Sequence, residues 1–168
     1  KQGIGWDAMT DCLLTQESPT RITGMRRSKG WSNDHRYYFD MEFSKPVTIV
    51  SRDTALTRTV IATEADGKPL LVKVALSPID VMGAKANMKA ELPGWDFDAA
   101  VTAADEAWDK QLARVTVETA DKEKKEVFYT AMYHFMIAPS VFCDANGDYR
   151  GADGRIHRAG YTTYSTFS

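Results

Sequence analysis

The spacing of the apolar residues changes once along the chain, near Ser77, and this change constrains the fold more than any other feature. Before it, in the segment 38–43, every second residue is apolar, with Phe39, Met41 and Phe43 on one face. After it, apolar residues recur at every third or fourth position. The first pattern indicates a half-buried antiparallel strand and the second an amphipathic helix. The chain is therefore predicted to be α+β, with the strands first and the helices after them.

The first part of the chain is predicted to be part of an antiparallel β-sandwich. Short segments rich in β-branched and aromatic residues are separated by turn residues, which is typical of a sandwich. The expected strands are 6–14, 21–27, 36–43, 47–50, 59–62 and 70–76. Asp66 and Gly67 lie between the last two of these, and Asp-Gly between two apolar runs predicts a hairpin that joins them.

Helices are predicted after these strands. Ser77, followed by Pro78, is expected to cap the first helix, which ends near Glu91. Asp96 and Asp98 place favourable negative charge at the start of the second helix. The apolar residues of this second helix share one face, and they are Phe97, Val101, Ala104, Trp108 and Leu112.

A third helix is predicted to begin at Thr119, as its cap, and to run to about Ile137, before Pro139 stops it. Its first turns are polar, but residues 127–136 are nearly all apolar or aromatic. A helix that is apolar all round must be buried there, and the chain offers few later elements to bury it. We therefore expect partner helices that this chain does not contain.

The balance of charges and the cysteines exclude several classes of site. The chain has 21 Lys and Arg against 23 Asp and Glu, a formal net charge of -2, so it lacks the basic surplus of a generic nucleic-acid-binding protein. No apolar run approaches the ~18 residues that a membrane span requires. Cys12 and Cys143 have no further cysteine at metal-ligand spacing, which excludes zinc and iron–sulfur sites. Two small buried thiols are the favoured interpretation, and a disulfide stays open.

The two ends of the chain indicate a piece of a larger protein. The chain begins at Lys1 without a methionine or a signal peptide, and it stops at Ser168 without a charged tail, a glycine or a proline. We expect the C-terminal end to be a cut end.

The segment 143–160 is predicted to be a loop rich in Gly and Asp. Within it, Asp144, Asn146 and Asp148 place oxygen ligands at alternate positions, a pattern that suits Ca²⁺. The pattern departs from an EF-hand loop, since Gly147 stands at the fourth position and Arg155 at the twelfth. An Asn-Gly turn with solvated carboxylates is the favoured interpretation.

A basic cluster lies beside an aromatic residue in the strand-rich part. It consists of Arg26, Arg27, Lys29 and Trp31. Aromatic and hydrogen-bonding side chains together can bind sugars, but charged side chains that pack their stems on Trp31 are the favoured interpretation.

Several motifs occur in an order that matches a known family. They are Thr23–Ser28, Gly30-Trp31, Phe43–Pro46, Pro93–Asp98, Phe128–His134, Ile137–Ser140 and Asp144–Gly154. Together they resemble glycoside hydrolase family 92, the exo-acting, calcium-dependent α-mannosidases typical of gut Bacteroidetes. The most specific blocks are Phe-Tyr-Thr-Ala-Met-Tyr-His at 128–134 and Asn-Gly-Asp-Tyr-Arg-Gly at 146–151.

The resemblance implies a β-sandwich joined by linker helices to an (α/α)6 barrel. Residues 1–76 would be the C-terminal part of the N-terminal sandwich domain, and residues 77–118 the helical linker. Residues 119–168 would be the start of the barrel catalytic domain, including its first helix. The loop 144–154 would then lie on the barrel rim, near the end that holds the active site.

The resemblance also implies inverting hydrolysis that removes terminal α-linked mannose, often α-1,2-linked. The family's acid and base carboxylates and most of its calcium ligands lie C-terminal to anything that matches this chain. Its Leu-Trp-Asp-Thr-Tyr-Arg block, which holds sugar contacts, would begin just after Ser168. No catalytic residue and no metal ligand is therefore assigned here, Ca²⁺ is expected in the full-length enzyme, and the chain alone is expected to be inactive.

The candidate substrate-binding residues are Tyr149, Arg150 and Tyr164, chosen from their places in the motifs. Arg150 could donate to sugar hydroxyls and the tyrosines could stack on a sugar ring, but roles in the core or in pinning a loop remain open. The expected partners are mannose-containing glycans of the N-glycan or mannan type and the remainder of the catalytic domain. The expected location is periplasmic or secreted.

Two other functions remain open at this point. The chain could be a non-catalytic carbohydrate-binding sandwich module with helical extensions, which would fold stably and bind mannosides. It could also be a small calcium-binding module built on the segment 144–148.

Overall fold

The computed structural model describes residues 8–30, 32–53 and 58–165. Contacts within the chain define two compact units. The first unit holds the residues up to Trp95 together with Phe142–Thr163, and the second holds Asp96–Val141 and the residues from Tyr164 onward. The boundaries predicted after residues 76 and 118 follow the linear sequence and stay a prediction.

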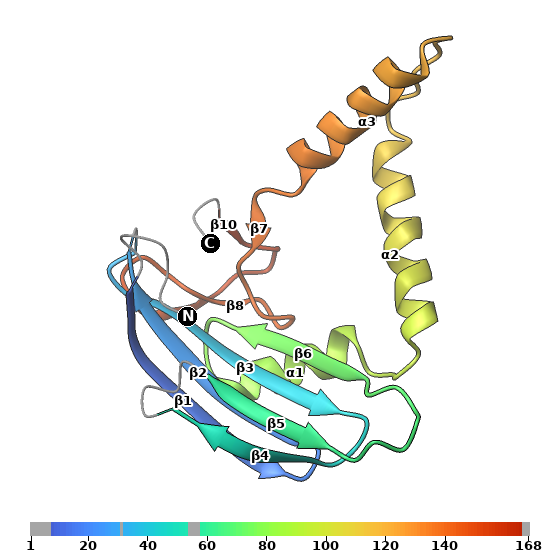
Figure 1. The fold of residues 1–168 in the computed structure, drawn as a ribbon. Helices are drawn as coiled ribbons and strands as arrows, with labels where there is room; N and C mark the ends of the chain where they lie inside the picture. The colour runs from blue at the N-terminus through green and yellow to red at the C-terminus, as the bar shows by residue number, and fades with distance from the viewer. Residues whose placement is uncertain (1–7, 31, 54–57, 166–168) are drawn as a thin grey trace. The chain divides into compact units, whose positions relative to one another are not determined.

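Two antiparallel sheets form the body of the first unit (Figure 1). The larger sheet has the order β1-β2-β3-β6, and the smaller sheet pairs β4 with β5. The strands are β1 (Ala8–Ser18), β2 (Arg21–Lys29), β3 (His35–Phe43), β4 (Val47–Arg52), β5 (Thr59–Thr63) and β6 (Val72–Ser77). The predicted strands are present, although Trp6, at the start of the first prediction, lies outside the described residues.

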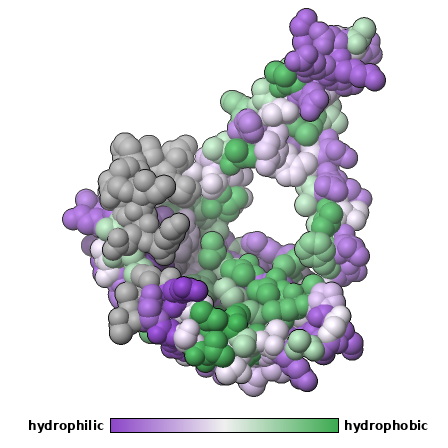
Figure 2. Space-filling view, in the orientation of Figure 1, coloured by the Kyte–Doolittle hydropathy of each residue, from purple (hydrophilic) through white to green (hydrophobic). Residues whose placement is uncertain are grey.

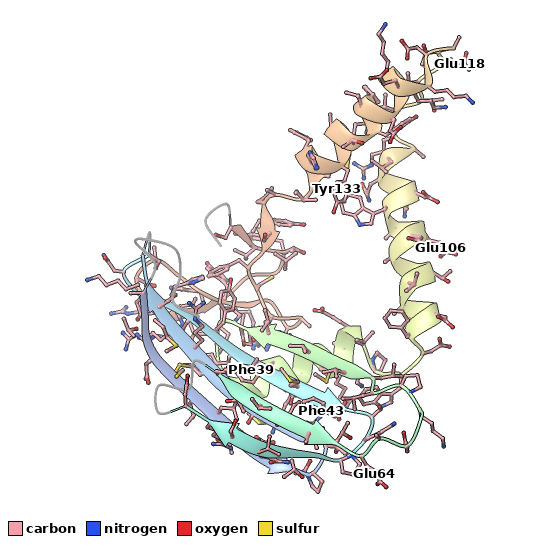
Figure 3. All side chains as sticks on the ribbon, in the orientation of Figure 1. Phe39, Phe43, Glu64, Glu106, Glu118 and Tyr133 are labelled. Atoms are coloured by element: carbon pink, nitrogen blue, oxygen red, sulfur yellow. The ribbon has the colours of Figure 1, made fainter. Side chains whose placement is uncertain are left out.

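The core lies between these two sheets. Ile22, Phe43 and Val47 are its buried residues. The partly buried residues that pack against them come from both sheets and their connections, and they are Leu14, Phe39, Met41, Ile49, Ile61 and Leu70. Phe39 and Phe43 lie on the same side of β3 (Figure 3), as their alternation predicts. The predicted antiparallel sandwich and the α+β class are thus confirmed.

The hairpin predicted at Asp66-Gly67 is wrong. Gly67 does form a turn, with a φ of 75°. However, β5 pairs with β4, where Ile49 is opposite Ile61, and β6 pairs with β3, where Phe39 is opposite Leu76. The connection therefore crosses from one sheet to the other. Lys45 holds it by donating to the Asp66 carboxylate and to the Lys68 carbonyl.

The helix α1 (Val81–Glu91) packs against β3 and β6. It covers the face of β3 that carries Asp40, which is 0% exposed. The alternation in β3 is therefore correct, but Asp40 at the centre of its polar face is not open to water. On the opposite face, Val72, Val74 and Leu76 of β6 are exposed, and Figure 2 shows apolar surface over this part of the sheet.

Two predicted helix caps are wrong. The cap of α1 is Asp80, whose side chain accepts from the backbone N–H of Gly83 at 2.7 Å, whereas Ser77 is the last residue of β6. The cap of α3 is Asp121 rather than Thr119. In both cases the cap is an aspartate whose side chain accepts from the backbone N–H three residues later. That N–H lies in the first turn of the helix and has no backbone partner within it. The predicted helix end near Glu91 and the start at Asp96 are confirmed.

The second unit contains α2 (Phe97–Leu112) and α3 (Lys122–Met136). The rings of Trp108 and Tyr133 join the two helices, with their centroids 4.7 Å apart. All residues of both helices are described, and none of them is buried. Phe135 is 82% exposed, so α3 has the uncovered apolar surface that its sequence predicts.

The described segment 115–118, which connects α2 to α3, forms no strand. The Tyr129 hydroxyl holds it by accepting from the Val117 N–H and donating to the Val115 carbonyl. Two short strands, β7 (Ser140–Val141) and β10 (Tyr164–Ser165), pair at the end of the unit.

Cys12 and Cys143, both within the described residues, are not joined by a disulfide, and both are partly exposed rather than buried. In the described part of the chain, no helix is long and apolar enough to cross a membrane.

Candidate functional site

The residues 142–163, called here the returning segment, contain one of the two blocks that are most specific to the family resemblance, residues 146–151. They belong to the first unit, although α2 and α3 separate them from it in sequence. The segment is not a plain loop, because β8 (Asp148–Arg150) and β9 (Ile156–Arg158) pair in it. The predicted Asn-Gly turn is confirmed: Gly147 has a φ of 87°, and the Asn146 side chain accepts from the N–H of Asp148. The solvated carboxylates predicted with this turn are wrong for Asp144, which is buried.

Tyr149 lies at the centre of this hairpin, opposite His157. Their ring centroids are 5.6 Å apart. The Nε2 atom of His157 lies 3.0 Å from the carboxylate of Asp153, and this contact lowers the pKa of Asp153. An aromatic ring beside exposed polar groups can stack on a sugar ring and bond its hydroxyls. The role of Tyr149 in sugar binding stays a prediction.

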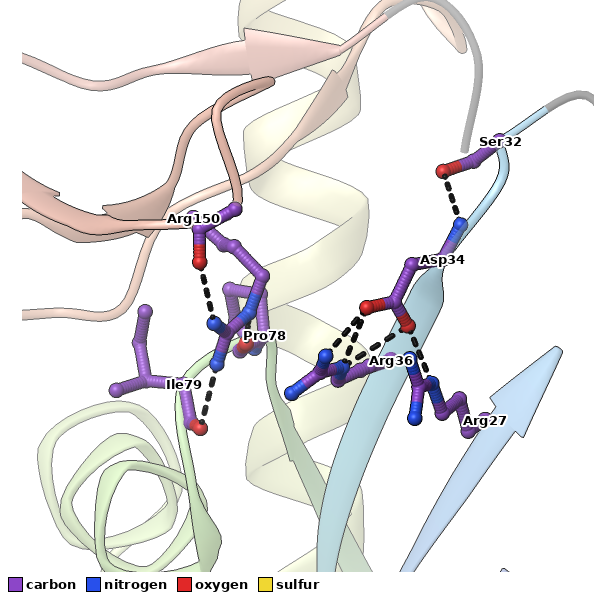
Figure 4. Close-up of polar contacts among 8 residues, drawn as sticks. Arg27, Ser32, Asp34, Arg36, Pro78, Ile79 and Arg150 are labelled. Carbon is purple, nitrogen blue, oxygen red and sulfur yellow. Dashed lines mark hydrogen bonds and ion pairs between the residues drawn. The ribbon is translucent and has the colours of Figure 1, made fainter. Parts of the chain in front are cut away.

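The Arg150 guanidinium is held by backbone carbonyls (Figure 4). Its Nε donates to the carbonyl of Pro78 at 3.0 Å, and its two Nη atoms donate to Ile79 and Gly154 at 3.2 Å and 3.0 Å. Three of its five N–H groups thus have partners. This arrangement pins the returning segment to the stretch before α1. The two remaining N–H groups could still donate to a ligand.

Tyr164 belongs to the second unit and is 57% exposed. It lines a groove of about 820 Å³. The other groove residues include Trp108, Arg114, Phe135 and Met136. The structure therefore places Tyr149 and Arg150 at consecutive positions of β8, where side chains alternate between faces, and Tyr164 in the other unit.

The alternating oxygens of residues 144–148 do not fit a calcium site. The Asp144 carboxylate accepts from Ser77 and Asn87, and the Asp148 carboxylate accepts from Arg158 and Asn146. These oxygens therefore do not converge on one point. Within the described residues, no group of three or more His, Cys, Asp or Glu side chains is arranged to hold a metal ion.

The predicted basic cluster is partly neutralised by an acidic residue. Arg27 donates to Asp34 at 2.6 Å, and Arg36 pairs with the same carboxylate (Figure 4). These two guanidinium groups hold the pKa of Asp34 well below its usual range. Trp31, the proposed aromatic partner, lies outside the described residues. The predicted packing of the charged side chains on Trp31 therefore stays a prediction.

The sequence did not reveal the partners of Asp144. Ser77 was expected to cap a helix, and Asn87 was not singled out. The sequence did contain a signal for Asn87, because this polar residue shares a helix face with the apolar residues Ala84 and Met88. All three are buried in α1. A polar side chain on the buried face of a helix needs a hydrogen-bonding partner from elsewhere in the fold.

Comparisons with known proteins agree on one family. The sequence profile described as the glycosyl hydrolase family 92 catalytic domain matches residues 83–168. No curated protein matches the chain at a significant level. Solved structures do match, as follows.

The chain superposes on the family GH92 α-mannosidase BT3965 from Bacteroides thetaiotaomicron with a TM-score of 0.82 and 31% identity. It also superposes on the GH92 family glycosyl hydrolase ccman5 with a TM-score of 0.80 and 22% identity. The inverting family GH92 mannosidase BT2199 from Bacteroides thetaiotaomicron VPI-5482 gives a TM-score of 0.73 and 23% identity. These matches cover 95%, 95% and 92% of this chain, and in each case the chain spans only 24% of the other protein.

Proposed function

Since the chain belongs to glycosyl hydrolase family 92, we propose that it is part of an enzyme that removes terminal α-linked mannose by inverting hydrolysis. The observation that carries this proposal is the likeness to an α-mannosidase over 95% of the chain, at 31% identity. The same α-mannosidase is also known in complex with mannoimidazole. A preference for α-1,2 linkages is part of the proposal and comes from the family resemblance.

Inversion sets the roles of the two carboxyl groups in such an enzyme. One donates a proton to the leaving oxygen, and the other takes a proton from a water on the opposite face of the sugar, so they stand about 6.5–9.5 Å apart. The family resemblance places both groups outside this chain. The chain would then be inactive by itself, and it would contribute the sandwich, the linking helices and part of the substrate surface.

The proposed sugar contacts are Tyr149, Arg150 and Tyr164. Tyr149 can present a ring to the apolar face of a sugar, as can the exposed Tyr164, while Arg150 has N–H groups left to donate. The calcium of the full-length enzyme would be held by residues beyond this chain, because the loop 144–148 does not fit it.

The proposed partners are mannose-containing glycans, of the N-glycan or mannan type, and the remainder of the catalytic domain. The exposure of Val127 and Phe135 supports the second partner, since such surface is normally covered. A periplasmic or secreted location is proposed from the family resemblance alone.

The test compares the full-length enzyme with the 168-residue chain on α-1,2-mannobiose. Proton NMR of the anomeric signals identifies the first product. We expect β-mannose from the full-length enzyme in the presence of calcium, loss of activity with a chelator, and no product from the chain alone. Release of α-mannose, or no cleavage of any α-mannoside, would overturn the proposal.

A carbohydrate-binding module is the second candidate function. The observation in its favour is that the first unit has its own core around Ile22, Phe43 and Val47. It predicts that the chain alone binds mannosides. Calorimetry with mannobiose separates the two functions, because the enzyme proposal expects weak or undetectable heat from the isolated chain.

A further inference from the structure

Asp144 is the one buried residue of the returning segment, all of which is described. It is 4% exposed, whereas the neighbouring strands β8 and β9 have no buried residue. Hydrophobic burial is the usual means of fixing a segment on a domain. No apolar residue of the returning segment is fully buried, so polar contacts contribute to fixing where the segment lies.

The Asp144 carboxylate is bonded on both oxygens by residues of the first unit. Its Oδ2 accepts from the Ser77 hydroxyl at 2.8 Å, and its Oδ1 accepts from the Asn87 side-chain N–H at 2.8 Å. Ser77 is the end of β6, and Asn87 lies in α1. The carboxylate therefore joins a strand and a helix to a segment far along the chain.

Ser77 and Asn87 also form hydrogen bonds with the backbone, and these bonds determine which of their groups is left to donate to Asp144. The Ser77 oxygen accepts from the N–H of Ile79 at 2.9 Å. The Asn87 amide also donates to the Leu76 carbonyl and accepts from the N–H of Ala145, each at 2.8 Å. Ser77 and Asn87 thus both need an acceptor at position 144, and a carboxylate supplies two.

The backbone of α1 is shaped to admit this carboxylate. A Cβ atom on Gly83 would lie 2.3 Å from Asp144 Oδ2 and 2.5 Å from Ser77 Oγ. Glycine inside a helix costs about 1 kcal/mol relative to alanine. A close approach between α1 and the carboxylate gives a physical reason for accepting that cost.

We propose that Asp144 is a positioning residue: with Ser77 and Asn87 it fixes the returning segment on the first unit and thereby sets the position of Tyr149 for sugar binding. The contacts of Arg150 with Pro78 and Ile79 form a second anchor on the same hairpin. The role in sugar binding rests on the proposed function, whereas the anchoring itself does not.

The experiment uses the full-length enzyme that carries this chain. Asp144→Asn keeps the size of the side chain but replaces one acceptor oxygen with a donor, which leaves Ser77 or Asn87 unpaired. We expect amide hydrogen exchange in residues 145–158 to become roughly tenfold faster, the KM for an α-mannoside to rise roughly tenfold, and kcat to stay within about twofold. A segment that only stabilised the fold would leave KM unchanged in the enzyme that remains folded.

The matched control is Asp148→Asn, because among the described residues the partners of that carboxylate, Asn146 and Arg158, both lie within the segment. It should leave exchange across the rest of the segment and KM within about twofold of the parent. If Asp144→Asn does not yield folded enzyme, Ser77→Ala removes one of the two hydrogen bonds and should shift both readouts in the same direction, by less.

Unchanged exchange in the folded Asp144→Asn enzyme would overturn the anchoring. Faster exchange with an unchanged KM would overturn the role in sugar binding. A parent enzyme that cleaves no α-mannoside would instead overturn the proposed function, and the role in sugar binding with it, while the exchange data would still decide the anchoring.

Discussion

The Oδ1 atom of Asp40 lies 3.2 Å from the Nε atom of Arg21, in the layer between the larger sheet and α1. Asp40 is fully buried there, while the Arg21 side chain is 32% exposed. Burial is the main cause that raises the pKa of Asp40, and Arg21 and Lys85 oppose it. A carboxylate in such a place links the stability of the sandwich to pH.

The first prediction concerns this linkage. A raised pKa means that the folded state binds the proton more tightly, so the stabilisation is fully present below the ordinary aspartate pKa of about 3.9 and is lost as the pH rises through the higher value. Asp40→Asn should remove this loss. Urea unfolding followed by circular dichroism should show that the free energy of unfolding of the parent falls, relative to that of Asp40→Asn, as the pH rises above about 4. A constant difference across this range would contradict the prediction.

The second prediction has the opposite sign. Arg36 and Arg27 lower the pKa of Asp34, so its stabilisation is present above the ordinary aspartate pKa and is lost as the pH falls through the lower value. Asp34→Asn should cost up to about 1 kcal/mol at neutral pH, because the group is partly exposed. The same unfolding series should show the cost shrinking in strong acid. A cost that grows on acidification would refute this assignment.

The third prediction concerns Gly83. Alanine at an exposed helical glycine normally stabilises a helix by about 1 kcal/mol. Here the added Cβ would meet Asp144 and Ser77, so Gly83→Ala should destabilise the protein by about 1–3 kcal/mol. The control is Met82→Ala on the same helix, where the side chain is 68% exposed and the change should stay within about 0.5 kcal/mol. A stabilising Gly83→Ala would show that the close approach is absent.

The fourth prediction concerns the apolar surface of α3. If the remainder of the catalytic domain covers Phe135, then Phe135→Ala should cost the full-length enzyme about 3 kcal/mol, as for a buried aromatic residue. In the isolated chain the same change should reduce aggregation with little loss of stability. Val50→Ala in β4, with Val50 57% exposed in the sandwich, serves as the control. Thermal unfolding of the full-length enzyme and of the isolated chain, each with and without the substitution, measures these effects. If Phe135→Ala has an equally small effect on the stability of both, the remainder of the catalytic domain does not cover Phe135.

Much of the fold could be predicted because the relevant signals are local. The alternation in β3 and the spacing of apolar residues in α2 each involve neighbours within a few positions. The starts of α1 and α3 were less well predicted. Ser77 and Thr119 are good caps in isolation, but the side chains of Asp80 and Asp121 accept from the backbone N–H groups of Gly83 and Lys124.

The sequence predicted which residues belong to the candidate site, but it did not predict their hydrogen-bond partners. The motif around Tyr149 and Arg150 indicated the family. However, two of the three carbonyl acceptors for Arg150 belong to Pro78 and Ile79, which are 72 and 71 residues away in the sequence. Asp144 had the residue type of a cation ligand, and its actual partner Ser77 is 67 residues away.

The sequence by itself determined the order of β1–β6 and α1–α3, the apolar faces of β3 and α2, and the family, because periodicity and motifs are encoded by residues close together in the chain. The tertiary structure alone decided that β6 pairs with β3 rather than β5, that α1 buries Asp40, and that Asp144 bonds Ser77 and Asn87. These contacts join residues far apart in sequence, and their energy depends on burial and geometry that exist only once the chain has folded.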